Sequence, residues 1–120
     1  MEKFRIIAIT HKSTELKDIG KLHLADDSAR QRLANLKDQL DMDELLYLST
    51  CNRVEFILVN DHILDLPFLQ RFFSAFNPDW TDEEVGWACA RCRTYEGVAA
   101  LQHLFYVASS VDSLVVGERE

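Results

Sequence analysis

Short apolar runs along the chain predict four strands. Phe4 to Thr10 is rich in β-branched residues and predicts a strand at the start of the chain. Glu44 to Ser49 and Val54 to Asn60 are apolar on both alternating faces, a pattern typical of central strands that are covered on each side. We interpret Trp87 to Tyr95 as a further strand.

Helical spacing of apolar residues predicts helices between and after these strands. Asp26 to Leu40 carries leucines three or four positions apart, and Asp65 to Phe76 begins close to a proline and continues as an apolar stripe. Thr81 to Glu84 has the pattern of a capping box, which opens a short helical turn. Glu96 to Ser110 predicts a long helix. Its apolar face is expected to contain residues at helical spacing: Val98, Leu101, Phe105 and Ala108.

The resulting order, β-α-β-β-α-β-α, predicts an α+β fold. Its first six elements match a ferredoxin-like split β-α-β sandwich, in which an antiparallel sheet carries helices on one face, and a C-terminal helix follows. A length of 120 residues suits one domain. The final residues, SLVVGERE, show no helix stop, and we therefore expect residues 1–120 to be one domain, truncated from a longer protein.

Composition narrows the classes of function. A net charge of −7 argues against a fold whose main surface holds a phosphate backbone, because such surfaces are basic. No apolar run reaches the roughly 20 residues of a membrane span, and the start lacks the features of a signal peptide. We therefore expect a cytoplasmic protein that does not enter a membrane. Three cysteines, an odd number, argue against a secreted disulfide framework.

Cys51 is the first candidate for chemistry. It lies in STCNRVEF, residues 49–56, where polar residues separate two apolar runs. One interpretation is a small packing residue, since cysteine is often buried; the other is a nucleophile whose thiolate Arg53 stabilises. Arg53 and Glu55 are similarly open to two interpretations. They form either a solvated pair at a strand edge, or a site in which the guanidinium grips a substrate carboxylate.

His103 lies in the last predicted helix, on the side opposite its apolar stripe. That side is semi-apolar, which indicates a helix packed on both faces or lining a cleft. His103 is therefore either a satisfied packing histidine or a general acid/base near a bound carbonyl. Its helical neighbours on this side are Ala99, Tyr106, Val107 and Ser110.

Other motifs favour neither metal nor nucleotide binding. Cys89 and Cys92 form a CxxC that no second pair accompanies, so we interpret them as incidental and expect no metal. The four glycines form neither GxGxxG nor a P-loop, which argues against a nucleotide-phosphate cradle in this chain.

Three motifs then agree in order and spacing with one family. They are ITHKST at residues 9–14, STCNRVE at 49–55, and HLFYVASSVDSLVVGE at 103–118. The chain resembles the N-terminal catalytic domain of the glutamyl-tRNA reductases. It departs from the family pattern at ELKDIGKL, residues 15–22, and at the final Arg119-Glu120.

The resemblance implies an NADPH-dependent oxidoreductase of tetrapyrrole biosynthesis. Cys51 would attack the ester of glutamyl-tRNA to form a thioester, which NADPH then reduces to glutamate-1-semialdehyde. His103 would act beside the reacting centre, and Thr50, Arg53 and Ser113 would bind the glutamyl group.

The resemblance also implies parts that these 120 residues do not supply. The NADPH-binding and dimerisation domains are expected outside this chain, and the full-length enzyme is expected to be a homodimer. The alternative function, from another class, is a non-catalytic ferredoxin-like binding or regulatory module with a structural cysteine.

Overall fold

The computed structural model describes the backbone of residues 3–117 and the side chains of residues 3–25 and 27–109. Its helices and strands follow in chain order: β1 (Phe4–Thr10), α1 (Leu16–Ile19), the 3-10 turn η1 (Gly20–Leu22), α2 (Asp26–Gln39), β2 (Glu44–Ser49), β3 (Arg53–Val59), α3 (Leu66–Phe76), α4 (Asp82–Arg91), β4 (Arg93–Glu96) and α5 (Gly97–Gly117).

The strands form one sheet in the order β2-β3-β1-β4, and every neighbouring pair is antiparallel. This confirms the predicted α+β class with an antiparallel sheet. β1 lies between β3 and β4 and is buried on both faces, as its run of apolar residues requires.

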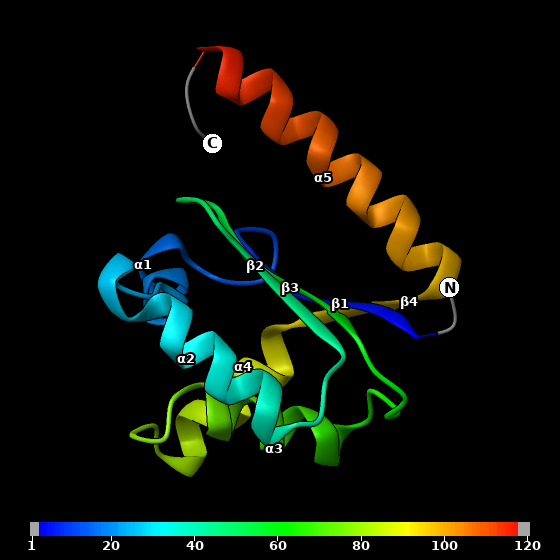
Figure 1. The fold of residues 1–120 in the computed structure, drawn as a ribbon. Helices are drawn as coiled ribbons and strands as arrows, with labels where there is room; N and C mark the ends of the chain where they lie inside the picture. The colour runs from blue at the N-terminus through cyan, green and yellow to red at the C-terminus, as the bar shows by residue number, and fades with distance from the viewer. Residues whose placement is uncertain (1–2, 118–120) are drawn as a thin grey trace.

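Helices cover the two faces of the sheet unequally (Figure 1). α1, α2, α3 and α4 lie on one side of it, and α5 crosses the other side alone. The larger core lies under the first group, where the Phe56 ring of β3 meets Phe72 and Phe76 of α3 with centroids 4.9 and 5.4 Å apart. A smaller core lies under α5 and contains Ile6, Ala8 and Ala100. None of the helices in the described residues is long and apolar enough to cross a bilayer.

The second predicted strand is not central. β2 pairs only with β3 and forms an edge of the sheet, and the Leu46 side chain is 62% exposed. β3, by contrast, is central as predicted. The apolar run of β2 alone could not distinguish the two positions, because an edge strand can also carry apolar residues on both faces.

The strand predicted at Trp87 to Tyr95 is wrong over most of its length. Residues up to Arg91 belong to α4, and only Arg93–Glu96 form β4. The capping box extends the helix through Ala88, which is fully buried in the larger core, so burial along a helical stripe outweighs the strand preference of the aromatic residues.

The face of α5 that packs on the sheet also differs from the prediction. Val98 and Phe105, from the expected apolar stripe, are 63% and 66% exposed, whereas Ala100 and Val107 are buried. Gly97 has a φ of 59°, in the left-handed region that favours glycine, and this turn joins the short edge strand β4 to α5. The chain therefore places the His103 side of the helix against the sheet.

The capping box at the start of α4 is complete, as predicted. The Thr81 hydroxyl accepts from the Glu84 amide at 3.2 Å, and the Glu84 carboxylate accepts from the Thr81 amide at 3.0 Å. Thr81→Ala is expected to lower the free energy of unfolding by about 1 kcal/mol, because orphan amides at the helix start lose a partner. Urea unfolding measures this, with Ser74→Ala on the exposed side of α3 as the control. An equal loss in both variants would contradict the assignment.

Candidate functional site

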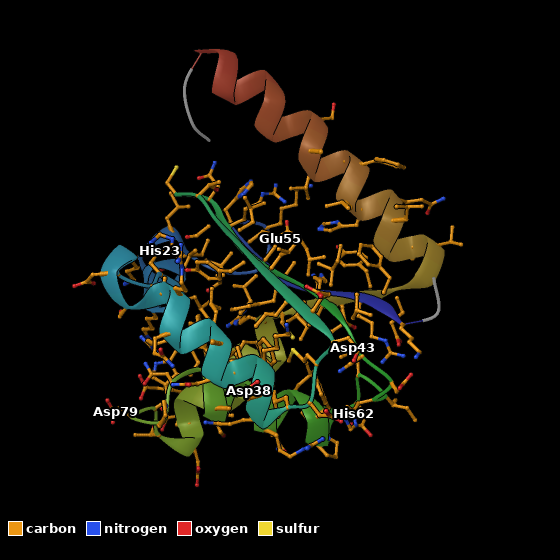
Figure 2. The ribbon with its side chains drawn as sticks, in the orientation of Figure 1. His23, Asp38, Asp43, Glu55, His62 and Asp79 are labelled. Atoms are coloured by element: carbon orange, nitrogen blue, oxygen red, sulfur yellow. The ribbon has the colours of Figure 1, made fainter. Side chains whose placement is uncertain are left out.

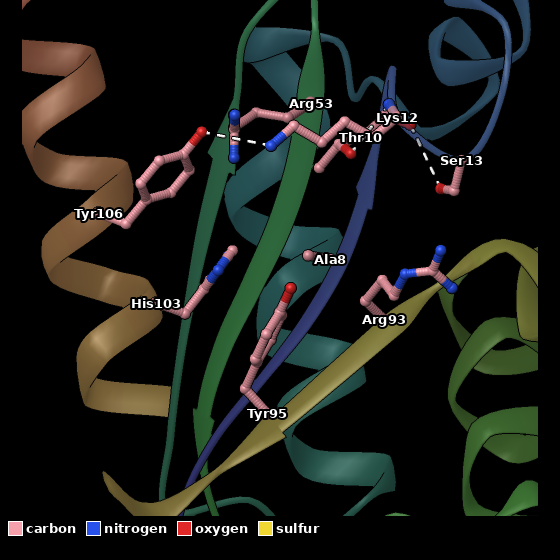
Figure 3. Close-up of a pocket in the computed structure, with 9 residues that line it drawn as sticks. All are labelled: Ala8, Thr10, Lys12, Ser13, Arg53, Arg93, Tyr95, His103 and Tyr106. Atoms are coloured by element: carbon pink, nitrogen blue, oxygen red, sulfur yellow. Dashed lines mark hydrogen bonds between the residues drawn. The ribbon is translucent and has the colours of Figure 1, made fainter. Parts of the chain in front are cut away.

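A pocket of about 270 Å³ lies between α5 and the sheet (Figure 3). Three of its lining side chains are cationic, and none of its lining residues is acidic. It is lined by Ala8, Thr10, Lys12, Ser13, Arg53, Arg93, Tyr95, His103 and Tyr106. This composition favours an anionic ligand.

Strand alternation brings these side chains to one face. Residues two apart on a strand share a face, so Arg53 lies on the same side of β3 as Glu55. In the register of the sheet, Ala8 lies opposite Glu55 on one flank and opposite Arg93 on the other. The small side chain of Ala8 leaves space on the pocket floor between Glu55 and Arg93.

The buried carboxylate of Glu55, which is labelled in Figure 2, connects two of the candidate residues. Glu55 is 1% exposed and accepts from Arg53 Nη1 at 2.8 Å and from His103 Nε2 at 2.7 Å. The alternative of a solvated pair at a strand edge is therefore wrong, because Arg53 and Glu55 lie on the central strand β3 and are both buried. The carboxylate fixes the direction of both side chains toward the pocket.

The ring of His103 is held from two sides. It stacks on Tyr95 with centroids 4.0 Å apart and ring planes at 11°, and its Nε2 faces Glu55. A carboxylate only accepts hydrogen bonds, so Nε2 donates and Nδ1 is the ring nitrogen left for proton exchange. His103 thus both packs against the sheet and lines a pocket.

Lys12 and Tyr106 meet across the pocket. Lys12 Nζ donates to the Tyr106 hydroxyl at 3.4 Å and lies 5.3 Å from the centroid of its ring. Lys12 comes from the loop after β1 and Tyr106 from α5, as Figure 3 shows. The contact links the HKST loop to the helix.

Cys51 and Thr50 lie in the β2–β3 hairpin, at the end of the sheet where Arg53 begins β3. Cys51 is exposed, and its Sγ lies 3.7 Å from Asn52 Oδ1. The hairpin is joined to the loop after β1 by the His11 amide, which donates to the Asn52 carbonyl at 2.9 Å. Neither Cys51 nor Thr50 lines the pocket, whereas Arg53 and His103 both do.

The third predicted substrate-binding residue, Ser113, lies on α5, but its side chain is outside the described residues. The predicted roles of Thr50, Cys51, Arg53, His103 and Ser113 stay predictions.

Cys89 and Cys92 lie at the C-terminal end of α4 rather than in a strand. Burial raises the pKa of both thiols, that of Cys92 to about 11. The raised pKa disfavours the thiolate, which is the reactive form of a cysteine. Within the described residues, no group of three or more His, Cys, Asp or Glu side chains is arranged to hold a metal ion.

Sequence reasoning missed Arg93 and Tyr95 as pocket residues. Both lie on β4, which was predicted as part of a longer strand with no known pairing partner. Their two-residue spacing predicts that they share a face of the strand. Which face meets the pocket depends on the pairing of Arg93 with Ala8 of β1, which the sequence does not show.

Comparisons with known proteins identify one family. The sequence profile described as "Glutamyl-tRNAGlu reductase, N-terminal domain" matches residues 7–120. A glutamyl-tRNA reductase from Nitratiruptor sp. is 35% identical over 120 residues, covering 98% of this chain and 27% of the relative. One from Campylobacter curvus is 37% identical over 116 residues, covering 95% of this chain and 26% of the relative.

A solved structure gives the same fold. Glutamyl-tRNA reductase from Methanopyrus kandleri matches with a TM-score of 0.64 at 24% identity, over 98% of this chain and 25% of that one. The chain spans about a quarter of the length of the relatives it matches.

Fold and pocket together define a small α+β domain that presents a cationic cavity beside an exposed cysteine. Within that class, the chain belongs to the family of glutamyl-tRNA reductase N-terminal domains.

Proposed function

We propose that residues 1–120 form a catalytic domain that accepts the glutamyl group of glutamyl-tRNA on Cys51. The observation that carries the proposal is the cationic pocket between α5 and the sheet, with Cys51 on the hairpin that leads into Arg53. A pocket of about 270 Å³ suits one amino-acid side chain rather than a nucleotide.

The glutamyl ester has one carboxylate, that of its side chain, and Arg53, which lines the pocket, is proposed to bind it. A guanidinium fork matches a carboxylate through two parallel hydrogen bonds. The Glu55 carboxylate accepts a hydrogen bond from Arg53 Nη1, which orients the guanidinium in the pocket wall. Thr50 and Ser113 are proposed to complete the contacts to the glutamyl group.

Acyl transfer then proceeds by nucleophilic attack. The Cys51 sulfur bonds to the ester carbonyl carbon, the bond from that carbon to the tRNA ribose oxygen breaks, and the ribose oxygen takes the proton released from the thiol. His103 is proposed to relay this proton through Nδ1, because Nε2 is held by Glu55. The product is a glutamyl thioester and free tRNA.

NADPH does not fit the residues described here. A dinucleotide is held by a glycine-rich turn between a strand and a helix, and the four glycines of the sequence form no such turn. We assign to this domain only the acyl transfer. The hydride that would reduce the thioester to glutamate-1-semialdehyde is proposed to come from NADPH held elsewhere in a homodimeric, cytoplasmic enzyme of tetrapyrrole biosynthesis.

The strand order also supports a finer fold assignment. The order β2-β3-β1-β4 with antiparallel neighbours is that expected of a ferredoxin-like split β-α-β sheet. We infer that α2 and the α3–α4 pair are its two helical connections and that α5 is an addition on the opposite face.

Intact-protein mass spectrometry tests the proposal directly. The full-length protein is mixed with glutamyl-tRNA in the absence of NADPH, quenched in acid, and digested to locate any added mass. We expect a glutamyl adduct on the peptide that contains Cys51, and none with deacylated tRNA. If no adduct forms and glutamyl-tRNA is not deacylated faster than in buffer, the domain is a binding module and Cys51 has a structural role.

A further inference from the structure

The pocket contains a second arginine whose charge is not used within the fold. Arg53 forms an ion pair with Glu55, so the charge of that pair is largely cancelled. Within the described residues, the exposed side chain of Arg93 forms neither a hydrogen bond nor an ion pair, yet it lines the same pocket (Figure 3). A cation that lines a small pocket without a partner favours an anionic ligand there.

The position of Arg93 is fixed by the sheet. Arg93 lies opposite Ala8 in β4, and Arg53 lies opposite Thr10 in β3, so the two arginines flank β1 on one face. β3 and β4 are two strand spacings apart, about 10 Å. Arginine side chains from both strands can therefore reach one carboxylate placed above β1.

Lys12 is less suited to the same task. Its ammonium already contacts Tyr106, and it extends from an exposed loop rather than from a strand. A guanidinium on a paired strand offers a planar fork in a fixed place, whereas an ammonium on a loop acts as a mobile point charge.

We propose that Arg93 is a specificity-determining residue, which together with Arg53 binds the side-chain carboxylate of the acyl group and discriminates glutamyl from glutaminyl esters. This inference rests on the proposed function of the pocket. The amide of a glutaminyl group carries no charge to pair with a guanidinium, so it gains little from Arg93. A charge-assisted contact of this kind changes a rate or an affinity by about 10- to 100-fold.

The test compares two substrates in three proteins. The rate of Cys51 acylation is measured by quenched intact mass with glutamyl-tRNA and with glutaminyl-tRNA, for wild type, Arg93→Gln and Arg30→Gln. Arg30 is an exposed arginine on α2, across the sheet from the pocket, so its variant carries the same change in net charge. Melting temperatures verify that each variant folds. We expect both to fold, because Arg30 and Arg93 are exposed and Arg93 lies on the edge strand β4.

We expect Arg93→Gln to lower the glutamyl rate about 10- to 100-fold and to leave the glutaminyl rate unchanged, while Arg30→Gln changes neither. Arg93→Lys should keep part of the preference, since it keeps the charge but not the fork. An unchanged ratio of the two rates in Arg93→Gln, with normal adduct formation, overturns the role of Arg93 and leaves the proposed function intact.

A binding measurement separates failure of the proposed function from failure of this inference. Saturation-transfer NMR is recorded with glutamate 1-methyl ester and with glutamine methyl ester, which need no acyl transfer. If wild type forms no Cys51 adduct but binds the glutamate ester better than the glutamine ester, and loses this preference in Arg93→Gln, the carboxylate site stands without the reaction. If no such preference exists, the inference is overturned as well.

Discussion

Cys51→Ser is expected to abolish glutamyl transfer to the chain and to leave the free energy of unfolding within about 0.5 kcal/mol of wild type. The hydroxyl of serine is a much weaker nucleophile at neutral pH than a thiol. Because Cys51 is exposed, its replacement removes almost no buried area. The two expectations together separate a catalytic cysteine from a packing one.

Cys89→Ser is the matched control for this prediction. Cys89 lies on α4, packed against the larger core, and burial raises the pKa of its thiol. Its variant should form the Cys51 adduct at the wild-type rate, measured by the same intact-mass assay. A Cys51→Ser protein that still acquires a stable glutamyl mass, or that unfolds at clearly lower urea concentration, would return Cys51 to a structural role.

Local signals in the sequence predicted those elements whose ends and faces are determined by neighbouring residues. α3 is an example: Asp65 caps it by accepting from the Phe68 amide, a proline occupies its first turn, and its apolar stripe is buried. β1 is another, because a continuous apolar run suits a strand that is covered on both faces.

The sequence could not decide which face of α5 packs on the sheet. Both faces carry apolar residues, and the larger ones, such as Phe105, are on the exposed side. The packed side instead contains Ala100, which lies against Ala8 and Ile6 of β1. Small residues allow a helix to approach a sheet closely, an effect that depends on the partner and is invisible in the periodicity of the helix alone.

Part of the candidate site was also predictable, because some of its contacts are local in the sequence. STCNRVE contains Arg53 and Glu55 in one strand, so their shared face follows from alternation. The contact between Glu55 and His103 joins residues 48 positions apart, and that of Ala8 with Arg93 depends on strand register. Such contacts are properties of the assembled sheet, so the buried network and the second arginine could be found only in the structure.

Removing the Glu55 side chain is expected to have the largest effect on stability. Glu55→Ala should lower the free energy of unfolding by about 3 kcal/mol, because Arg53, itself 4% exposed, would lose a buried counter-charge and His103 would lose an acceptor. Glu55→Gln keeps the shape and one acceptor oxygen and should cost less, about 1–2 kcal/mol. Urea unfolding at fixed pH measures both losses.

Glu96→Gln provides the matched comparison, since Glu96 also pairs with an arginine. Its carboxylate lies 3.6 Å from Arg5 Nη1 but its side chain is 51% exposed, so the loss should stay below about 1 kcal/mol. A double-mutant cycle that combines Glu55→Gln with Arg53→Met then isolates the coupling between the two buried groups. A coupling near zero, or an equal loss in Glu96→Gln, would contradict the assignment of Glu55 as their structural link.

Glu55→Gln should also reduce acyl transfer, through its effect on His103. In Glu55→Gln one acceptor oxygen faces two donors, so the amide NH2 lies against either Arg53 Nη1 or His103 Nε2 and one of these two hydrogen bonds is lost, while the His103 ring keeps its stack on Tyr95. We expect Glu55→Gln to slow Cys51 acylation about 100-fold, a loss typical of a misplaced general acid/base. A wild-type acylation rate in a folded Glu55→Gln protein would mean that His103 acts without help from Glu55, and that the buried carboxylate serves the fold alone.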